Sequence, residues 1–218
     1  MSEVKVIAFN KYSVAEEITN AISHGIGAFL SIAALVLLII KSAQYEHVSY
    51  ILTTIIYGIS LFFLYTSSTL YHSIQLPKLR NKLNVMDHIA IYFLIAGTYT
   101  PYAIITIGGA LGWVILGIVW SLALMGFIIK LFFFGKYNTL SAIGYLVMGW
   151  IVIFVVKSLY LQLGAAGTFW LFAGGFFYSV GAVLYLLEKL TFNHAIFHFF
   201  VLAGSISHFI SVYWYVLK

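Results

Sequence analysis

Charged residues are scarce in this sequence. They make up 8% of its 218 positions, whereas soluble domains carry roughly 25%. Apolar residues make up 63% of the chain. Since so few charges cannot cover a globular surface with polar groups, the composition excludes a water-soluble fold. It predicts an integral, multi-pass protein of the cell membrane.

Cysteine is absent, which excludes disulfide bonds and thiolate ligands. Any bound metal would therefore have nitrogen and oxygen ligands only. The 11 basic residues exceed the 6 acidic ones, but they are scattered near the ends of apolar runs, where they would meet anionic lipid headgroups. The net charge of +5 thus indicates membrane lipid as the partner and no nucleic acid.

Long apolar runs fill most of the chain and predict an all-α bundle of seven membrane-spanning helices. Each run has the length of about 20 residues that crosses a bilayer, and a helix satisfies its own backbone hydrogen bonds in lipid. The whole chain, 1–218, would form one domain, with 1–20 as a cytoplasmic or interfacial segment. The glycine-rich stretch 107–113 separates the third and fourth runs. The seven runs are 22–40, 48–71, 89–107, 111–133, 139–157, 167–187 and 195–217.

The distribution of basic residues predicts the orientation of these spans. One side would carry Lys5, Lys11, Lys78, Arg80, Lys82, Lys130, Lys136 and Lys189. The other side would carry Lys41, Lys157 and Lys218. The side with more basic residues is usually cytoplasmic. The pattern therefore predicts a cytoplasmic N-terminus and, with seven spans, a C-terminus outside.

Histidines from distant parts of the chain would meet at the cytoplasmic face. His194 and His198 are four residues apart, so both project from one face of a helix. This spacing alone also fits helix capping or contact with headgroups. His72, at the end of the second span, would arrive at a matching depth, and three imidazoles with one open position are typical of a catalytic zinc site. The sequence therefore predicts that these three residues bind Zn²⁺.

Two further side chains have both a functional and a structural interpretation. Ser68 lies one turn before His72 and could face the same site, or its hydroxyl could bond to its own helix. Asp87 is the only aspartate. It could orient a water or take its proton, or it could cap the third span, and the two roles are compatible. Glu17, Asn20 and His24 share one helical face and predict a brace around the ligands rather than ligands themselves.

Six ordered motifs resemble the bacterial hemolysin III proteins, within the superfamily of progestin and adiponectin receptors. The motifs extend nearly from end to end: EITNAISHG at 17–25, SSTLYH at 67–72, MDH at 86–88, GTYTP at 97–101, GGFFYSVGAVLY at 174–185 and HAIFHFFVLAGSISHF at 194–209. The resemblance implies seven helices, a cytoplasmic N-terminus, and zinc held by His72, His194 and His198. It also implies that Ser68 and Asp87 line the zinc site.

The superfamily is also similar to alkaline ceramidases, which implies metal-dependent hydrolysis of a lipid amide or ester. In this interpretation zinc activates a water, Ser68 helps to stabilise the oxyanion and Asp87 transfers the proton. A second interpretation is a non-catalytic membrane sensor or regulator with a structural zinc. A third is a pore-forming or haemolytic protein, but its conduction path should be polar along its length, and the polar residues here crowd at one face.

Overall fold

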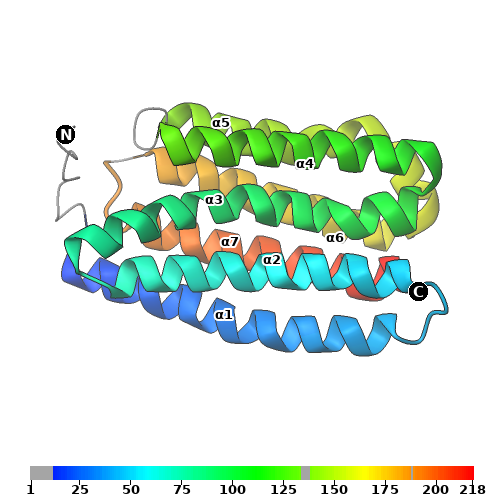
Figure 1. Ribbon diagram of the computed structural model, residues 1–218, viewed down its shortest axis with the longest axis horizontal. Coiled ribbons are helices and arrows are strands. Elements are labelled where there is room, and N and C mark those ends of the chain that lie inside the picture. The colour runs from blue at the N-terminus through cyan, green and yellow to red at the C-terminus, as the bar shows by residue number, and fades with distance from the viewer. Residues whose placement is uncertain (1–11, 134–137, 188) are drawn as a thin grey trace.

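The computed structural model describes residues 12–133, 138–187 and 189–218, and every regular element within them is helical. The chain forms an elongated bundle whose helices lie nearly side by side along its long axis (Figure 1). In chain order the elements are α1 (Val14–Ser42), α2 (Val48–Ser73), α3 (Pro77–Pro101), η1 (Tyr102–Ile107), α4 (Gly109–Phe132), α5 (Asn138–Gly149), η2 (Trp150–Val155), α6 (Val156–Leu186), α7 (Asn193–Ser211) and η3 (Val212–Val216).

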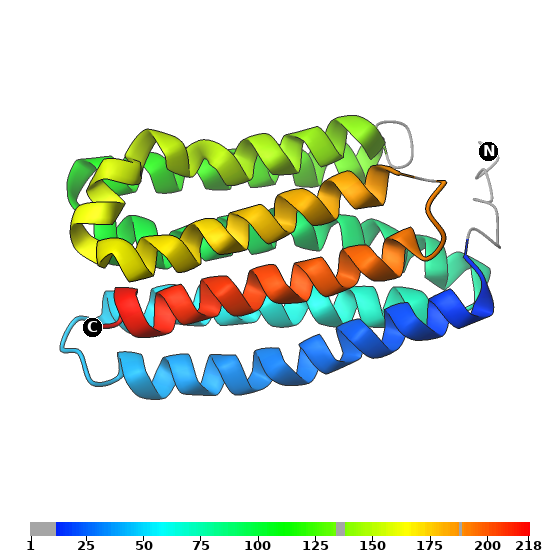
Figure 2. The ribbon, with the colours of Figure 1, turned by 180° about the vertical axis from the view of Figure 1, so that it is seen from behind.

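Six helical segments within the described residues are long and apolar enough to span a membrane. The predicted fifth and sixth runs lie together in one of these segments, Thr139–Leu186, which has 48 residues. Gly164 interrupts its helical conformation with a φ of 71°, and the chain reverses its direction in this region (Figure 2). The expected seven separate helices are therefore six membrane-capable segments, one of which folds back on itself.

Glycine and proline fix the other predicted break. α3 ends at Pro101 and continues as the π-helix η1, consistent with the loss of a backbone donor at proline. Gly108 and Gly109 then adopt positive φ angles of 62° and 54°, which side chains other than glycine rarely tolerate. This turn separates η1 from α4 and confirms the predicted boundary within 107–113.

Two helix starts differ from the prediction. α1 is continuous from Val14, because Ser13 caps it by accepting a hydrogen bond from the Glu16 backbone N at 3.2 Å. The sequence placed only 22–40 in the first span, after an interfacial segment 1–20. α3 begins at Pro77, where proline suits the first helical turn, so its polar first turns precede the apolar run. Asp87 lies well inside α3, and its alternative role as a helix cap is therefore wrong.

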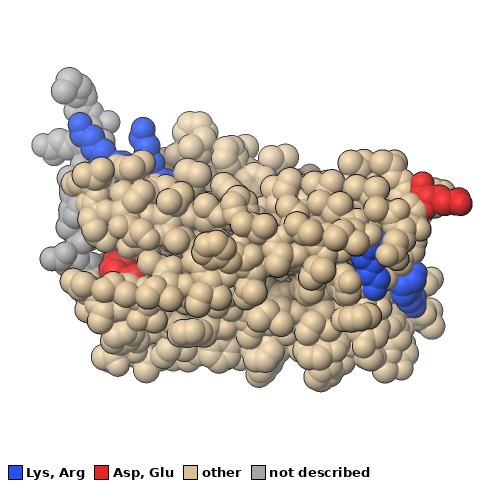
Figure 3. All heavy atoms as spheres, turned by 90° about the horizontal axis from the view of Figure 1, so that it is seen from below, with Lys and Arg blue, Asp and Glu red and all other residues tan. Residues whose placement is uncertain are grey.

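The surface of the bundle is apolar, as a lipid-facing surface must be. Large side chains point outwards, including Phe29, Phe132 and Phe154, which are 78%, 71% and 85% exposed. The acidic and basic side chains visible in Figure 3 lie near the two ends of the molecule, and the middle of that face has none. Lys5, Lys11 and Lys136, which belong to the predicted charge asymmetry, lie outside the described residues.

Candidate metal site

Three histidines meet at the end of the bundle where α1 begins. His194 and His198 lie one turn apart in α7, and His72 lies in the last turn of α2. Each offers one ring nitrogen, and these nitrogens all lie within 4.8 Å of one another. The residues are 2%, 6% and 1% exposed in the order His72, His194, His198. The geometry expected from the sequence, with these rings gathered at one end, is present.

The Nδ1 atom of each ring is held from one short segment of the chain, residues 12–23. His72 Nδ1 lies 2.6 Å from Glu17 Oε2. His194 Nδ1 lies 3.1 Å from the Tyr12 hydroxyl. His198 Nδ1 lies 3.2 Å from the Ser23 hydroxyl and 3.3 Å from the backbone oxygen of Asn20. With all three Nδ1 atoms engaged, Nε2 of each ring remains for a shared ligand.

This donor set fits a zinc ion. A carboxylate only accepts hydrogen bonds, so His72 donates its Nδ1 proton to Glu17 and presents a lone pair at Nε2. His72 Nε2 lies 3.1 Å from His194 Nε2. Two nitrogens that bind zinc at about 2.0–2.1 Å in a tetrahedral site lie roughly 3.3 Å apart. A carboxylate behind a histidine is also the usual support for a metal ligand.

Glu17 connects the histidines to the basic end of α3. Its second oxygen, Oε1, forms an ion pair with Arg80. Arg80 also donates to Gln75 Oε1 at 2.5 Å and lies over the Tyr71 ring, 4.9 Å from its centre. Because Arg80 is held on three sides, it fixes the carboxylate that orients His72. Arg80 was considered only for the orientation of the spans, and its part in this network was missed.

Tyr12 and His24 enclose the cluster from two sides. The centre of the Tyr12 ring lies 4.8 Å from that of His194, and burial raises the pKa of its hydroxyl above the ordinary value, so the group stays neutral. His24 stacks on His198 with ring centres 3.5 Å apart and an angle of 7°. The expected brace of Glu17, Asn20 and His24 thus contacts the triad. Tyr12 and Ser23 were not foreseen, because neither stands out in a helical pattern.

Ser68 and Asp87 lie beside the histidines rather than among them. Both line the same cavity as His194 and His198. Ser68 is 1% exposed and makes no hydrogen bond of normal geometry, although its hydroxyl is close enough to interact with the Asp87 carboxylate. Asp87 in turn interacts electrostatically with His72. The pair therefore adds one hydroxyl and one carboxylate to the wall of the cavity that His194 and His198 also line.

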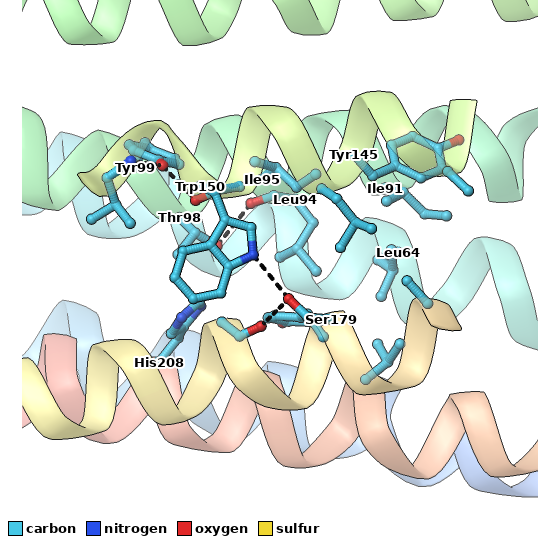
Figure 4. Close-up of a pocket in the computed structure, with 18 of the residues that line it drawn as sticks. Leu64, Ile91, Leu94, Ile95, Thr98, Tyr99, Tyr145, Trp150, Ser179 and His208 are labelled. Atoms are coloured by element: carbon cyan, nitrogen blue, oxygen red, sulfur yellow. Dashed lines mark hydrogen bonds between the residues drawn. The ribbon is translucent and has the colours of Figure 1, made fainter. Parts of the chain in front are cut away.

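The cavity extends from the triad deep into the bundle and has a volume of about 160 Å³. Its wall is largely apolar, with Leu64, Ile91, Leu94 and Ile95 on one side (Figure 4). His208 lies at the end remote from the triad, ten residues further along α7, which corresponds to roughly 15 Å. His208 was expected to be a hydrogen-bonded packing residue, and its Nε2 does donate to the Leu171 backbone oxygen at 3.0 Å.

Comparison with known proteins places this bundle in a family. Residues 12–209 match the family described as Haemolysin-III related. The chain is 51% identical over 204 residues to "Hemolysin-3" of Bacillus cereus, covering 94% of this chain and 93% of that protein. It is 50% identical over 207 residues to the "Hemolysin-3 homolog" of Bacillus subtilis (strain 168), covering 95% and 97%.

A more distant similarity fits the wider superfamily. The chain is 28% identical over 173 residues to the human "Monocyte to macrophage differentiation factor", covering 77% of this chain and 71% of that protein. The family match and the six membrane-capable helices identify a multi-pass protein of the plasma membrane. The chain belongs to the haemolysin III family.

Proposed function

We propose that this protein is a zinc-dependent hydrolase that cleaves an amide or ester bond of a membrane lipid. The observation that carries the proposal is the position of the histidine triad at one end of a long apolar cavity. Ligand cavities of this kind are mostly apolar, with a few polar groups that fix the orientation of the ligand. A lipid could place its chain along the cavity and its carbonyl beside the triad.

His72, His194 and His198 would hold the ion through Nε2. When bound, zinc would lower the pKa of a water ligand towards about 7 and polarise the lipid carbonyl. The Ser68 hydroxyl would donate a hydrogen bond to the carbonyl oxygen as it gains negative charge. Asp87 would take a proton from the attacking water and return it to the leaving nitrogen or oxygen as the bond to the acyl carbon breaks. The products are a free fatty acid and an amine or alcohol.

The proposal includes the topology on which access depends. We propose that the 48-residue segment Thr139–Leu186 crosses the membrane twice, because 48 residues of helix extend roughly 72 Å and a bilayer core is about 30 Å thick. The chain would then have seven crossings, a cytoplasmic N-terminus and an external C-terminus. Since the chain has no cysteine, single cysteines at positions 46 and 78 can be labelled from one side of the membrane at a time. Position 78 should react only from the cytoplasmic side.

The decisive experiment is fatty-acid release by purified, zinc-loaded protein in lipid nanodiscs. The substrates are ceramides, other N-acyl lipids and lipid esters of one chain length, with an alkaline ceramidase as positive control. Ser68→Ala and Asp87→Asn should lower kcat by roughly 100-fold or more while zinc content is retained. The hydrolase proposal is refuted if none of these substrates releases a fatty acid while zinc is bound and the control enzyme is active.

A structural zinc is the second candidate, and one observation favours it. The cluster joins α2 to α7, and the same two helices are also joined by a hydrogen bond of 2.7 Å between the Tyr65 hydroxyl and Ser205. A metal that only links these helices would raise the unfolding temperature, whereas Ser68→Ala and Asp87→Asn would leave cellular function unchanged. These variants therefore separate the two candidates. The apolar wall of the cavity does not favour a conducting pore.

A further inference from the structure

The deep end of the cavity contains polar groups that play no part in the metal site. Most of them are satisfied within the protein. Trp150 Nε1 donates to the Ser179 hydroxyl at 2.9 Å, as Figure 4 shows. The Tyr178 hydroxyl shares a hydrogen bond of 2.7 Å with Ser205. The polar groups of these pairs already have hydrogen-bond partners within the protein. His208 differs from them because one of its ring nitrogens has none within the described part of the chain.

His208 has one ring nitrogen without a partner among the described residues. Its Nε2 must carry the proton, because it faces the Leu171 backbone oxygen at 3.0 Å and a carbonyl only accepts. A neutral imidazole then has an acceptor lone pair at Nδ1, and a charged ring this deep in the membrane would be costly. His208 is 9% exposed, and Nδ1 makes no hydrogen bond. An unsatisfied buried acceptor of this kind calls for a donor from outside the protein.

A second hydroxyl from another helix lies in the same region. Tyr102 lines the cavity, is 3% exposed, and its hydroxyl makes no hydrogen bond of normal geometry. The side chain of Ser211 is the nearest interaction partner of the Tyr102 hydroxyl, and the centre of the Tyr178 ring lies 5.4 Å from that of His208. Tyr102 also begins the π-helix η1, and π-helical turns are frequent at functional sites.

We propose that this end of the cavity recognises a hydroxyl group carried on the hydrocarbon chain of the lipid ligand. The ligand hydroxyl donates to His208 Nδ1, and its oxygen can accept from Tyr102. The hydroxyl would lie roughly 15 Å from the triad, because ten residues of α7 separate His198 from His208. The inference rests on the proposed use of the cavity for a lipid chain, but it does not require hydrolysis.

Binding of free fatty acids tests this site separately from catalysis. The probes are octadecanoic acid and a series of octadecanoic acids with one hydroxyl at successive carbons, competing with a fluorescent fatty acid for the full-length, zinc-loaded protein in nanodiscs. Hydroxyls within a narrow range of positions should improve affinity by roughly 2–10-fold over the unsubstituted acid. Positions on either side of this range should give no gain.

His208→Leu removes the Nδ1 acceptor, together with the Nε2 hydrogen bond to the Leu171 oxygen, and leaves an apolar side chain of similar size. This variant should lose the preference for hydroxylated acids while its affinity for octadecanoic acid and its zinc content stay unchanged. Tyr102→Phe should reduce the preference in part. Ser179→Ala, which alters a lining residue that already has a partner, serves as the matched control and should keep the full preference.

Three results would overturn the proposal. The first is equal affinity for all the acids, which would mean that a trapped water or the protein itself satisfies His208. The second is a parallel loss of affinity for plain and hydroxylated acids in His208→Leu, which would make the residue structural. The third is no binding of any fatty acid to the cavity. A protein that hydrolyses no lipid but keeps the hydroxyl preference would refute the proposed reaction and leave this site standing.

Discussion

Charged side chains have different kinds of partner at the two ends of the bundle. At the triad end, Glu17 pairs with both His72 and Arg80, and all three side chains come from different helices. At the other end, Lys41 donates to the Tyr213 backbone oxygen at 2.5 Å and lies 4.4 Å and 4.7 Å from the ring centres of Tyr213 and Trp214. Lys218 similarly donates to the backbone oxygen of Gln162.

The difference separates a chemical site from an anchoring site. A backbone oxygen and an aromatic face can hold a cation, but neither exchanges a proton and neither is a usual ligand of zinc. The triad end instead gathers imidazoles and carboxylates whose side chains are buried against one another, an arrangement that is costly in a membrane unless it has a function. Substitutions at the two ends should therefore affect different measurements: metal binding at the triad end, and thermal stability alone at the other.

The largest effect is expected from His72→Ala. It removes the only ligand on α2, and two histidines of one helix bind zinc much more weakly than three. Zinc in the purified protein should fall from about one ion per chain to background, as measured by elemental analysis. His47→Ala, which changes an exposed histidine at the opposite end, is the control and should retain zinc. If His72→Ala keeps about one zinc ion per chain, the triad is not the metal site. The contrast between the two ends would then also be wrong.

A smaller loss is expected from Glu17→Gln. The amide oxygen can still accept the His72 Nδ1 proton, but the negative charge that pairs with Arg80 and supports His72 as a metal ligand is gone. Partners of this kind typically change metal affinity by roughly 10–100-fold, and competition with a zinc chelator would measure the change. Glu46→Gln alters an exposed acid at the other end and should have no effect. An equal change in both variants would indicate a general effect of net charge.

Tyr12→Phe should have a still smaller effect on metal binding. It removes one neutral hydrogen bond to His194 and keeps the ring that covers the cluster. The expected loss of zinc affinity is roughly 2–10-fold, measured in the same chelator competition. Tyr45→Phe changes a tyrosine in the loop at the opposite end and should leave affinity unchanged. If Tyr12→Phe had no effect, the segment before α1 would cover the site without orienting its ligands.

The sequence could predict the convergence of the triad because alternating spans bring every second helix end to one face. His72 ends one span and His194 begins another, so their common depth follows from the length of the helices. Glu17 could be placed by the same argument. In contrast, Tyr12 precedes α1, and no period of the sequence indicates that it folds over His194. Its position depends on packing between segments 182 residues apart.

Periodicity also fails where one apolar segment contains a reversal. Hydropathy predicts two runs between 139 and 187, but only the backbone at Gly164 shows where the chain changes direction. The start of α3 was missed for the opposite reason. Its first turns are polar, so an apolar pattern cannot detect them, and Asp87 was considered a possible cap although it lies in the middle of a helix. The unpaired Nδ1 of His208 is likewise a property of tertiary contacts.

The smallest effect is expected at the anchoring end, from Lys41→Met. Methionine keeps the apolar length of the side chain but loses the hydrogen bond to the Tyr213 oxygen and the contact of the cation with two rings. An interaction of this kind contributes about 0.5–1 kcal/mol at an accessible site. The unfolding temperature should fall slightly, and zinc affinity should match that of the unmodified protein. Since η3, which carries Tyr213, directly follows α7, a loss of zinc affinity in Lys41→Met would mean that α7 transmits disturbance along its whole length, and the two ends would no longer be independent.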